Sequence, residues 1–260
     1  MCRIFYSLNQ PNTESKIHRF LKQSDHLEKN TPGLNSASDS HTHPDGFGLA
    51  GFAEGKWVVY KSPRLYREIE NLDEIVSRMA AHSLVIGHIR KCDTTYSRVQ
   101  RENTHPFYYR NHVFLHNGYL RHYSDHRSKL EKLVDPDLRA HIKGDTDTET
   151  MFYLILSILR KQEGKMGVER LHLAFQELFR KVSSIVSKYN ANIIYGNKEY
   201  SAVIRYAHGP QNPPSLYMNG SSRSGMLITS EPISRSYSII PRNCMMVMDN
   251  ASGNYSWRKV

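Results

Sequence analysis

A cysteine follows the initiator methionine directly, in MCRIFYSL at residues 1–8. A small residue at position 2 allows the methionine to be removed, and Cys2 would then carry a thiol and a free α-amine on one carbon. The pKa of an α-amine is about 7.7–8.0, so the amine is partly neutral at cellular pH and can accept the thiol proton. Cys2 is therefore a candidate nucleophile with its own base. The alternative is a small cysteine buried under the first strand.

An Asn-Gly pair in FLHNGYL, residues 114–120, is the second candidate group. The side-chain amide of Asn117 and the backbone N–H of Gly118 could both donate to one developing oxyanion, which is how acyl-transfer sites stabilise a tetrahedral intermediate. Asn-Gly is also the commonest two-residue hairpin turn, and here it would end a strand at 112–118. Both interpretations are open at this point.

Two kinds of charged residue could hold an amino acid at its α-carbon. Arg90 ends GHIR, and a guanidinium there could hold a carboxylate through two parallel hydrogen bonds or form a structural ion pair. Asp145 and Asp147 lie in KGDTDTET, at the start of a predicted helix, where acids cap the helix or interact with its dipole. Alternatively, one of the two acids could bind a substrate ammonium. Together the two anchors would define an α-amino acid.

The elements that must position these residues predict a layered α+β protein. Helical periodicity predicts helices at 67–81, 147–161 and 168–188. Residues 9–45 are predicted to be loop, with one helical turn around Ile17, Phe20 and Leu21. Strands are predicted at 3–8, 46–52, 56–62, 83–90, 112–118, 191–197, 200–207, 215–219, 225–230, 243–249 and 255–259. Because the main helices lie between two groups of strands, we expect α+β layers rather than a doubly wound sheet.

Length and composition are those of an ordinary globular protein, with 260 residues of which 39% are hydrophobic and 23% charged. One domain over residues 2–260 is the simplest expectation. No apolar run approaches the ~20 residues of a membrane-spanning helix, so no membrane is expected as a partner. The N-terminus has no signal-peptide pattern, and a cytoplasmic location is therefore expected.

The cysteines and the net charge bear on three further classes: disulfide-rich, zinc-binding and nucleic-acid-binding proteins. Cys2, Cys92 and Cys244 are few, odd in number and without a CxxC pair, so neither a disulfide framework nor a zinc site is expected. The net charge of +10 would allow nucleic-acid binding. The basic residues are scattered, however, so nucleic acid is an unlikely partner.

Seven motifs occur in a fixed order along the chain: MCR, HPDGFGLAG, GHIR, THPF, FLHNG, DTDTE and TSEP. In this order they resemble the class II glutamine amidotransferases, and most of all their stand-alone, Dug3/EgtC/YafJ-like branch. The resemblance implies a four-layer αββα sandwich of the N-terminal-nucleophile hydrolase type. It also implies an enzyme that needs no metal or organic cofactor.

The resemblance carries roles to individual positions. It implies Cys2 as the nucleophile with its α-amine as base, and Asn117 with Gly118 as the oxyanion hole. It implies that Arg90 holds the α-carboxylate of a glutamyl group and Asp147 its α-ammonium. Three further residues match family positions near the site without an assigned role: His105, Ser230 and Glu231.

The chain departs from the family directly after GHIR. Small residues often follow the arginine in the family, whereas Lys91, Cys92 and Asp93 follow it here. These positions can border the glutamine pocket, so the departure bears on substrate preference. The segment from 9 to 42 also matches poorly.

The expected activity is hydrolysis of a γ-glutamyl amide through a Cys2 thioester, with glutamine or a γ-glutamyl compound such as a glutathione-like peptide as substrate. One alternative is a glutaminase subunit that supplies ammonia to a separate synthetase, which requires a protein partner. Another is an inactive scaffold or nucleic-acid-binding protein. Four intact candidate residues favour an enzyme, because an inactive descendant has no physical need for all of them: Cys2, Arg90, Asn117 and Asp147.

Overall fold

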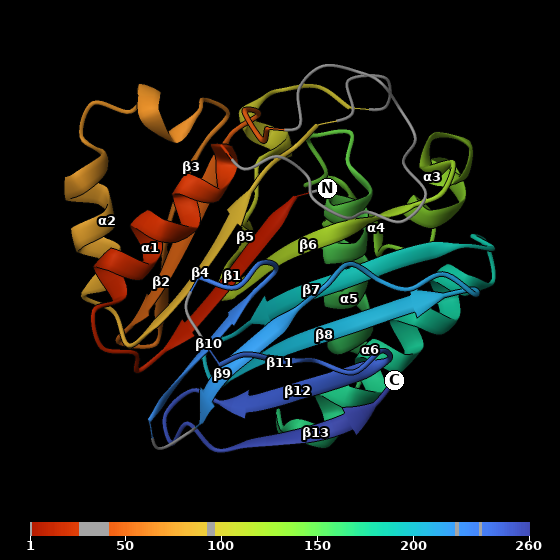
Figure 1. Cartoon of the computed structure of the whole chain (residues 1–260). Helices are drawn as coiled ribbons and strands as arrows, with labels where there is room; N and C mark the ends of the chain where they lie inside the picture. Colours follow the sequence, from red (N-terminus) through yellow and green to blue (C-terminus); the bar gives the residue numbers. More distant parts are fainter. Residues whose placement is uncertain (1, 26–41, 93–96, 222–223, 234–235) are drawn as a thin grey trace.

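Two antiparallel sheets packed face to face form the framework of the protein (Figure 1). The computed structural model describes residues 2–25, 42–92, 97–221, 224–233 and 236–260. Sheet A has the strand order β11 (Ser238–Ile239), β9 (Tyr217–Ser221), β10 (Gly225–Thr229), β1 (Arg3–Leu8), β4 (Leu84–Ile89), β2 (Phe47–Ala53) and β3 (Lys56–Ser62). Sheet B has the order β13 (Tyr255–Lys259), β12 (Cys244–Asp249), β8 (Tyr200–His208), β7 (Tyr189–Gly196), β6 (His112–Leu120) and β5 (Phe107–Tyr109).

Helices cover the outer face of each sheet (Figure 1). α1 (Thr13–Lys22) and α2 (Leu72–Ala80) pack on sheet A, where they share an apolar cluster with β1, β2 and β4. α5 (Asp147–Lys161) and α6 (Val168–Ser183) pack on sheet B. Shorter helices complete the described elements: α3 (Tyr123–Glu131), α4 (Pro136–Arg139), η1 (Gln23–Asp25), η2 (Tyr66–Glu68) and η3 (Arg101–Asn103). The expected αββα order of layers is confirmed.

β1 lies in the middle of sheet A, with β10 on one side and β4 on the other. Successive side chains of a strand point to opposite faces. Phe5 therefore packs toward the helices, 5.1 Å between ring centroids from Phe20 of α1. Ile4, Tyr6 and Leu8 pack between the two sheets. Burial on both faces explains why the run is almost continuously apolar, and pairing on both sides ties down an end of the chain that would otherwise fray.

Most predicted elements are present, but several bounds are wrong. The region predicted as loop with one turn contains the ten-residue helix α1, because Ile17, Phe20 and Leu21 form one face that packs against sheet A. Residues 26–41 of that region lie outside the described part of the chain. The helix predicted from residue 67 begins at Leu72, after the 3₁₀ turn η2. The helix predicted to reach residue 188 ends at Ser183.

The longest described helix, α6, has sixteen residues. Among the described residues, no helix combines the length and apolarity that a bilayer crossing requires.

A buried hydrogen bond connects β1 of sheet A to sheet B, and its removal tests how much it stabilises the fold. The hydroxyl of the buried Tyr6 lies 2.9 Å from Ser201 Oγ of β8 and donates to Met248 Sδ of β12 at 3.0 Å. Tyr6→Phe leaves the buried Ser201 hydroxyl without this partner, so we expect the free energy of unfolding to fall by about 1–2 kcal/mol. Denaturant unfolding measures it. Tyr108→Phe, at a side chain 44% exposed, is the control, and equal losses in both variants would contradict the account.

Candidate functional site

The layer between the sheets is apolar along most of its length and polar at one end. On β4 the inward-facing row runs Leu84, Ile86 and then His88, with Arg90 two residues further on. β6 follows the same pattern, since Val113 and Leu115 precede Asn117. Strand alternation alone therefore brings polar side chains from both sheets to one end of the layer.

Cys2 and Ser230 belong to this polar end. Cys2 stands two residues before Ile4, and Ile4 pairs with His88, which places Cys2 next to Arg90 in register. Ser230 follows β10 and donates its backbone N–H to Ile4 O at 3.1 Å. Cys2, Arg90 and Ser230 are far apart in the sequence. The pairing of β1 with its two neighbours brings them together.

The Ser230 hydroxyl joins the two sheets at this point. Its Oγ accepts a hydrogen bond from the backbone N–H of Ile4 at 3.0 Å and another from Asn117 Nδ2 at 3.3 Å. Asn117 Oδ1 is buried and has no hydrogen-bond partner among the residues that the structure describes. The Asn117 amide is thus held across the interface, beside the strand that begins after Cys2.

Asn117 and Gly118 form no hairpin turn, so that interpretation is wrong. β6 continues through both residues to Leu120, and they pair with Asn192 and Ala191 of β7. Glycine is required at 118 by close approach, because a Cβ there would lie 2.1 Å from Asn190 O and 2.4 Å from His116 Nε2. Neighbouring backbone therefore packs directly on this residue.

The half-buried Cys2 thiol lies against the backbone that follows Arg90. Cys2 Sγ accepts from Lys91 N–H at 3.4 Å and donates to Lys91 O at 3.5 Å. Next to it, Arg3 Nε forms an ion pair with Glu231 Oε2 at 3.3 Å. Met1 lies outside the described residues.

The Arg90 guanidinium is buried, with only 3% of the residue exposed. Nη2 donates to Ser97 Oγ at 2.9 Å and to Cys92 Sγ at 3.1 Å, whereas Nη1 has no hydrogen-bond partner in the part of the chain that the structure describes. Within the described part of the chain, no carboxylate lies at ion-pair distance from Arg90, so no structural ion pair is found there. Asp93, the third residue of the departure from the family, lies outside the described residues.

Asp147 stands at the first position of α5, close to the end of β6. Its Oδ2 accepts from Leu120 N–H at 2.7 Å, and its Oδ1 accepts from Thr148 Oγ1 at 3.2 Å. The helix cap is Thr146, which accepts from Glu149 N–H at 3.3 Å, and not Asp145. The contacts of Asp147 go to β6 and α5 and not to Cys2 or Arg90.

Two residues that the sequence analysis missed hold the loop before Asp147. The buried Asn103 donates to Asp145 Oδ1 at 2.6 Å and accepts from Asp145 N–H at 2.9 Å. Glu149 accepts from Lys143 N–H at 3.0 Å and Gly144 N–H at 2.7 Å, and burial raises the pKa of its carboxyl. The T-x-x-E spacing of a capping box could have indicated Glu149. No local signal indicated Asn103.

His105 is buried in the protein interior, next to His88. Its ring stacks on His88 with centroids 3.9 Å apart. Burial, reinforced by nearby positive charges, holds the pKa of each imidazole well below the ordinary value, so both rings are neutral at pH 7. Among the described residues, no three His, Cys, Asp or Glu side chains converge as metal ligands.

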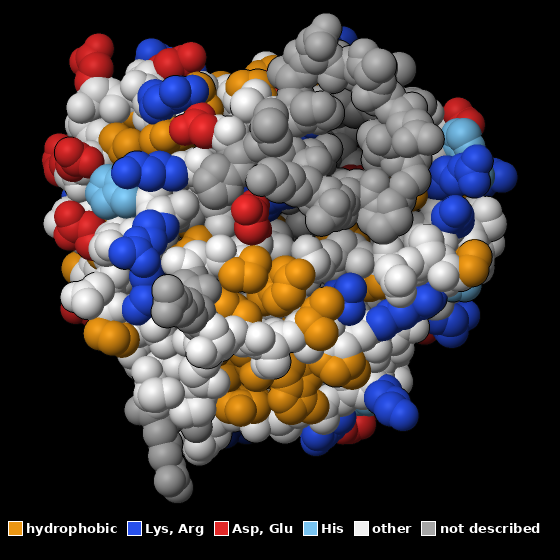
Figure 2. Space-filling view, in the orientation of Figure 1, with side chains coloured by type: hydrophobic (Ala, Val, Ile, Leu, Met, Phe, Trp, Pro, Cys, Tyr) orange, Lys and Arg blue, Asp and Glu red, His pale blue; other side chains and the backbone are white. Residues whose placement is uncertain are grey.

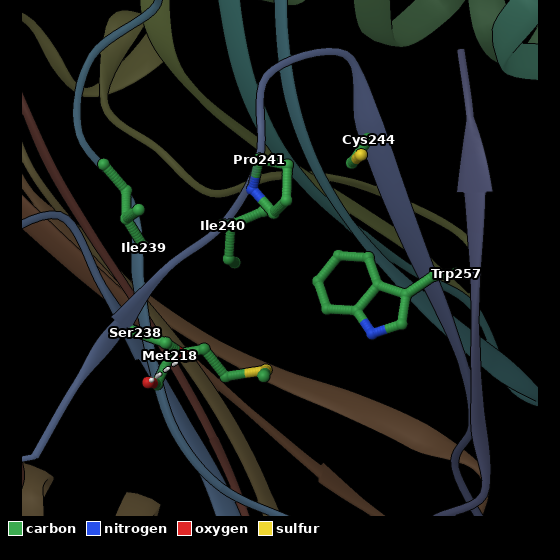
Figure 3. A pocket seen from close by; sticks show the side chains of 7 residues that line it. All are labelled: Met218, Ser238, Ile239, Ile240, Pro241, Cys244 and Trp257. Carbon is green, nitrogen blue, oxygen red and sulfur yellow. Dashed lines mark hydrogen bonds between the residues drawn. The ribbon is translucent and has the colours of Figure 1, made fainter.

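An apolar groove is separate from this polar end. It has a volume of about 310 Å³ and is lined by residues of β9, β11, β12 and β13 and of the segment after β11 (Figure 3). Hydrophobic side chains gather over these strands on the face seen in Figure 2. None of the predicted site residues lines it; the lining residues are Met218, Ser238, Ile239, Ile240, Pro241, Cys244 and Trp257.

The two neutral imidazoles predict a loss of stability in acid. The unfolded chain takes up protons below a pH of about 6.5, whereas folded His88 and His105 resist protonation until lower pH. The contribution of these two neutral rings to the free energy of unfolding is therefore complete above pH 6.5 and is lost as the pH falls below it. We expect His105→Gln to reduce the slope of unfolding free energy against pH, between pH 6.5 and 5, by up to about 1.4 kcal/mol per pH unit.

His122→Asn, at an exposed position, is measured alongside as the control for loss of a histidine at the surface. Denaturant unfolding at several pH values measures the slope, and an unaltered slope in His105→Gln would refute the assignment.

Comparisons with known proteins identify the family of the chain. The family model for class II glutamine amidotransferases matches residues 31–200. The probable glutamine amidotransferase DUG3 of Saccharomyces cerevisiae is 29% identical over 136 residues, which cover 47% of this chain and 37% of the yeast protein. The chain thus spans well under half the length of that relative.

Solved structures share the fold. The glutamine aminotransferase class-II domain protein from Silicibacter pomeroyi aligns over 99% of both chains, with a TM-score of 0.64 and 18% identity. The glutamine phosphoribosylpyrophosphate amidotransferase from B. subtilis aligns over 99% of this chain and 49% of its own, with a TM-score of 0.65 and 15% identity. The fold is of the N-terminal-nucleophile hydrolase type, and with its family model matched over most of its length, the chain belongs to the class II glutamine amidotransferases.

Proposed function

We propose that the protein hydrolyses a γ-glutamyl amide through a thioester on Cys2. The substrate is glutamine or a γ-glutamyl compound such as a glutathione-like peptide. The observation that carries the proposal is the pair of hydrogen bonds to Ser230 Oγ, from Ile4 N–H at 3.0 Å and Asn117 Nδ2 at 3.3 Å. They hold an amide donor beside the strand that Cys2 precedes.

The nucleophile is the Cys2 thiolate, formed after removal of Met1 when the new α-amine takes the thiol proton. The hydrogen bond from Lys91 N–H to Cys2 Sγ, at 3.4 Å, supports this role because it fixes the sulfur next to the backbone that follows Arg90. The thiolate attacks the γ-carbonyl carbon of the substrate.

The oxyanion of the tetrahedral intermediate is bound by Asn117 and Gly118. The Nδ2 group of Asn117 has two N–H bonds, and Ser230 occupies one, so the other is available for the substrate oxygen. A fixed amide costs no reorganisation at the moment of reaction. One such donor is typically worth about a hundredfold to a thousandfold in rate.

Arg90 binds the α-carboxylate and Asp147 the α-ammonium of the glutamyl group. The buried and unpartnered Nη1 of Arg90 supports the first role, because a carboxylate would satisfy it with a charge-assisted bond. From the described residues, each oxygen of Asp147 accepts one hydrogen bond. A carboxylate has about four acceptor positions, so it can still receive an ammonium.

Collapse of the intermediate expels ammonia or an amine, which takes a proton from the α-ammonium of Cys2. Water then hydrolyses the γ-glutamyl thioester and releases glutamate. Every step uses groups of this chain and water. We propose that residues 2–260 form one domain, which the shared core between the two sheets supports.

A second proposal keeps this chemistry but sends the ammonia to a separate synthetase. The B. subtilis amidotransferase favours it, because a domain of this fold makes up only 49% of that chain. Low hydrolysis by the protein alone and a rise with a bound partner would distinguish it from a stand-alone hydrolase.

Replacing the thiol tests the nucleophile. We expect Cys2→Ala to abolish glutamate release from glutamine and from γ-glutamyl peptides, because no other group can form the thioester. Its unfolding midpoint should stay close to that of the parent protein. Cys244→Ala, in the separate groove, is the matched control and should retain turnover. Turnover near the parent rate in Cys2→Ala would rule out the proposal.

A further inference from the structure

The two terminal nitrogens of Arg90 have different surroundings. Nη2 donates to Ser97 Oγ at 2.9 Å and to Cys92 Sγ at 3.1 Å. Nη1 is buried and has no hydrogen-bond partner among the described residues. A buried donor without a partner is costly and gains strongly when an acceptor arrives. Only 3% of Arg90 is exposed, so packing and these contacts hold its side chain in place.

The pair that holds Nη2 is itself fixed. Cys92 Sγ lies 3.1 Å from Ser97 Oγ and donates to Ser97 O at 3.2 Å. The backbone N–H of Cys92 donates to Asp45 Oδ2 at 2.7 Å, and Asp45 N–H donates to Arg90 O at 3.3 Å. The contacts close a ring from Arg90 through Cys92 and Asp45 back to Arg90.

Both partners of Nη2 are uncharged. Burial raises the pKa of the Cys92 thiol, so the sulfur stays a neutral thiol at pH 7. A carboxylate in its place would neutralise Arg90 and compete with an anionic ligand. A thiol and a hydroxyl fix the geometry of the guanidinium and leave its positive charge for the ligand.

We propose that Cys92 and Ser97 are positioning residues that hold Nη2 of Arg90 and so direct Nη1 to the α-carboxylate of the γ-glutamyl substrate. This inference rests on the proposed function, in which Arg90 is the carboxylate anchor. It gives the departure from the family at Cys92 a physical task in substrate binding. A guanidinium that is already held loses less freedom when the ligand binds.

The test measures binding and catalysis separately in the full chain. We expect Cys92→Ala with Ser97→Ala to raise KM for L-glutamine about tenfold, as expected for the loss of a charge-assisted contact, while kcat changes less than twofold. In the double variant, serine in place of alanine at position 92 (Cys92→Ser with Ser97→Ala) keeps a hydroxyl acceptor and should restore most of the affinity for L-glutamine. Cys244→Ala is the control for loss of a thiol elsewhere.

Calorimetric titration of L-glutamine into Cys2→Ala protein, with and without the two substitutions, measures the dissociation constant without turnover. A roughly tenfold weaker Kd in the substituted protein is the expected result. Equal dissociation constants, an equal fall in kcat, or no rescue by Cys92→Ser would overturn the inference alone. If neither L-glutamine nor a γ-glutamyl peptide such as glutathione binds with Cys92 and Ser97 intact, the proposed function is refuted and this inference with it.

Discussion

The pairing of β1 on both of its edges determines where Cys2, Arg90 and Ser230 lie relative to one another. β1 pairs with β4 at six positions and with β10 at four. Without these bonds an N-terminal cysteine would lie on a fraying end and could not keep a fixed distance to any partner. With them, Cys2 stands next to Arg90 in register, and Ser230 stands next to Ile4.

Register also decides which face each of these groups occupies. Because side chains alternate along a strand, a slip of one residue in β1 or β4 would turn Cys2 or His88 toward the helices. The apolar contacts of Ile4, Tyr6 and Leu8 between the sheets oppose such a slip. The large core thus fixes the geometry of a small polar end, where Ser230 Oγ connects β1 to Asn117 of the opposite sheet.

The sequence alone was sufficient to predict the layers and to single out most of the residues at the polar end, since each of these residues lies in a short motif with a recognisable pattern. It could not decide between a turn and a strand at Asn117 and Gly118, because local propensity favours the turn and pairing with β7 overrides it. The extent of α1 was missed because its apolar residues are few and are explained only by packing on sheet A.

Contacts between residues far apart in the sequence could not be predicted from the sequence. Asn103 binds Asp145, 42 positions away, and nothing near Asn103 in the sequence indicates that contact. Cys92 stood out as a departure from the family, but only its distance of 3.1 Å to Arg90 Nη2 gives that departure a physical meaning.

The central claim is that Cys2 is a processed and reactive N-terminal nucleophile. The measurement that tests it most directly is the intact mass of the purified protein before and after incubation with a diazoketone analogue of glutamine. The account predicts a starting mass without the initiator methionine, followed by a single adduct that maps to Cys2. A retained Met1 with no adduct at Cys2 would contradict it, because the amine base and the free thiol would then not stand on the same residue.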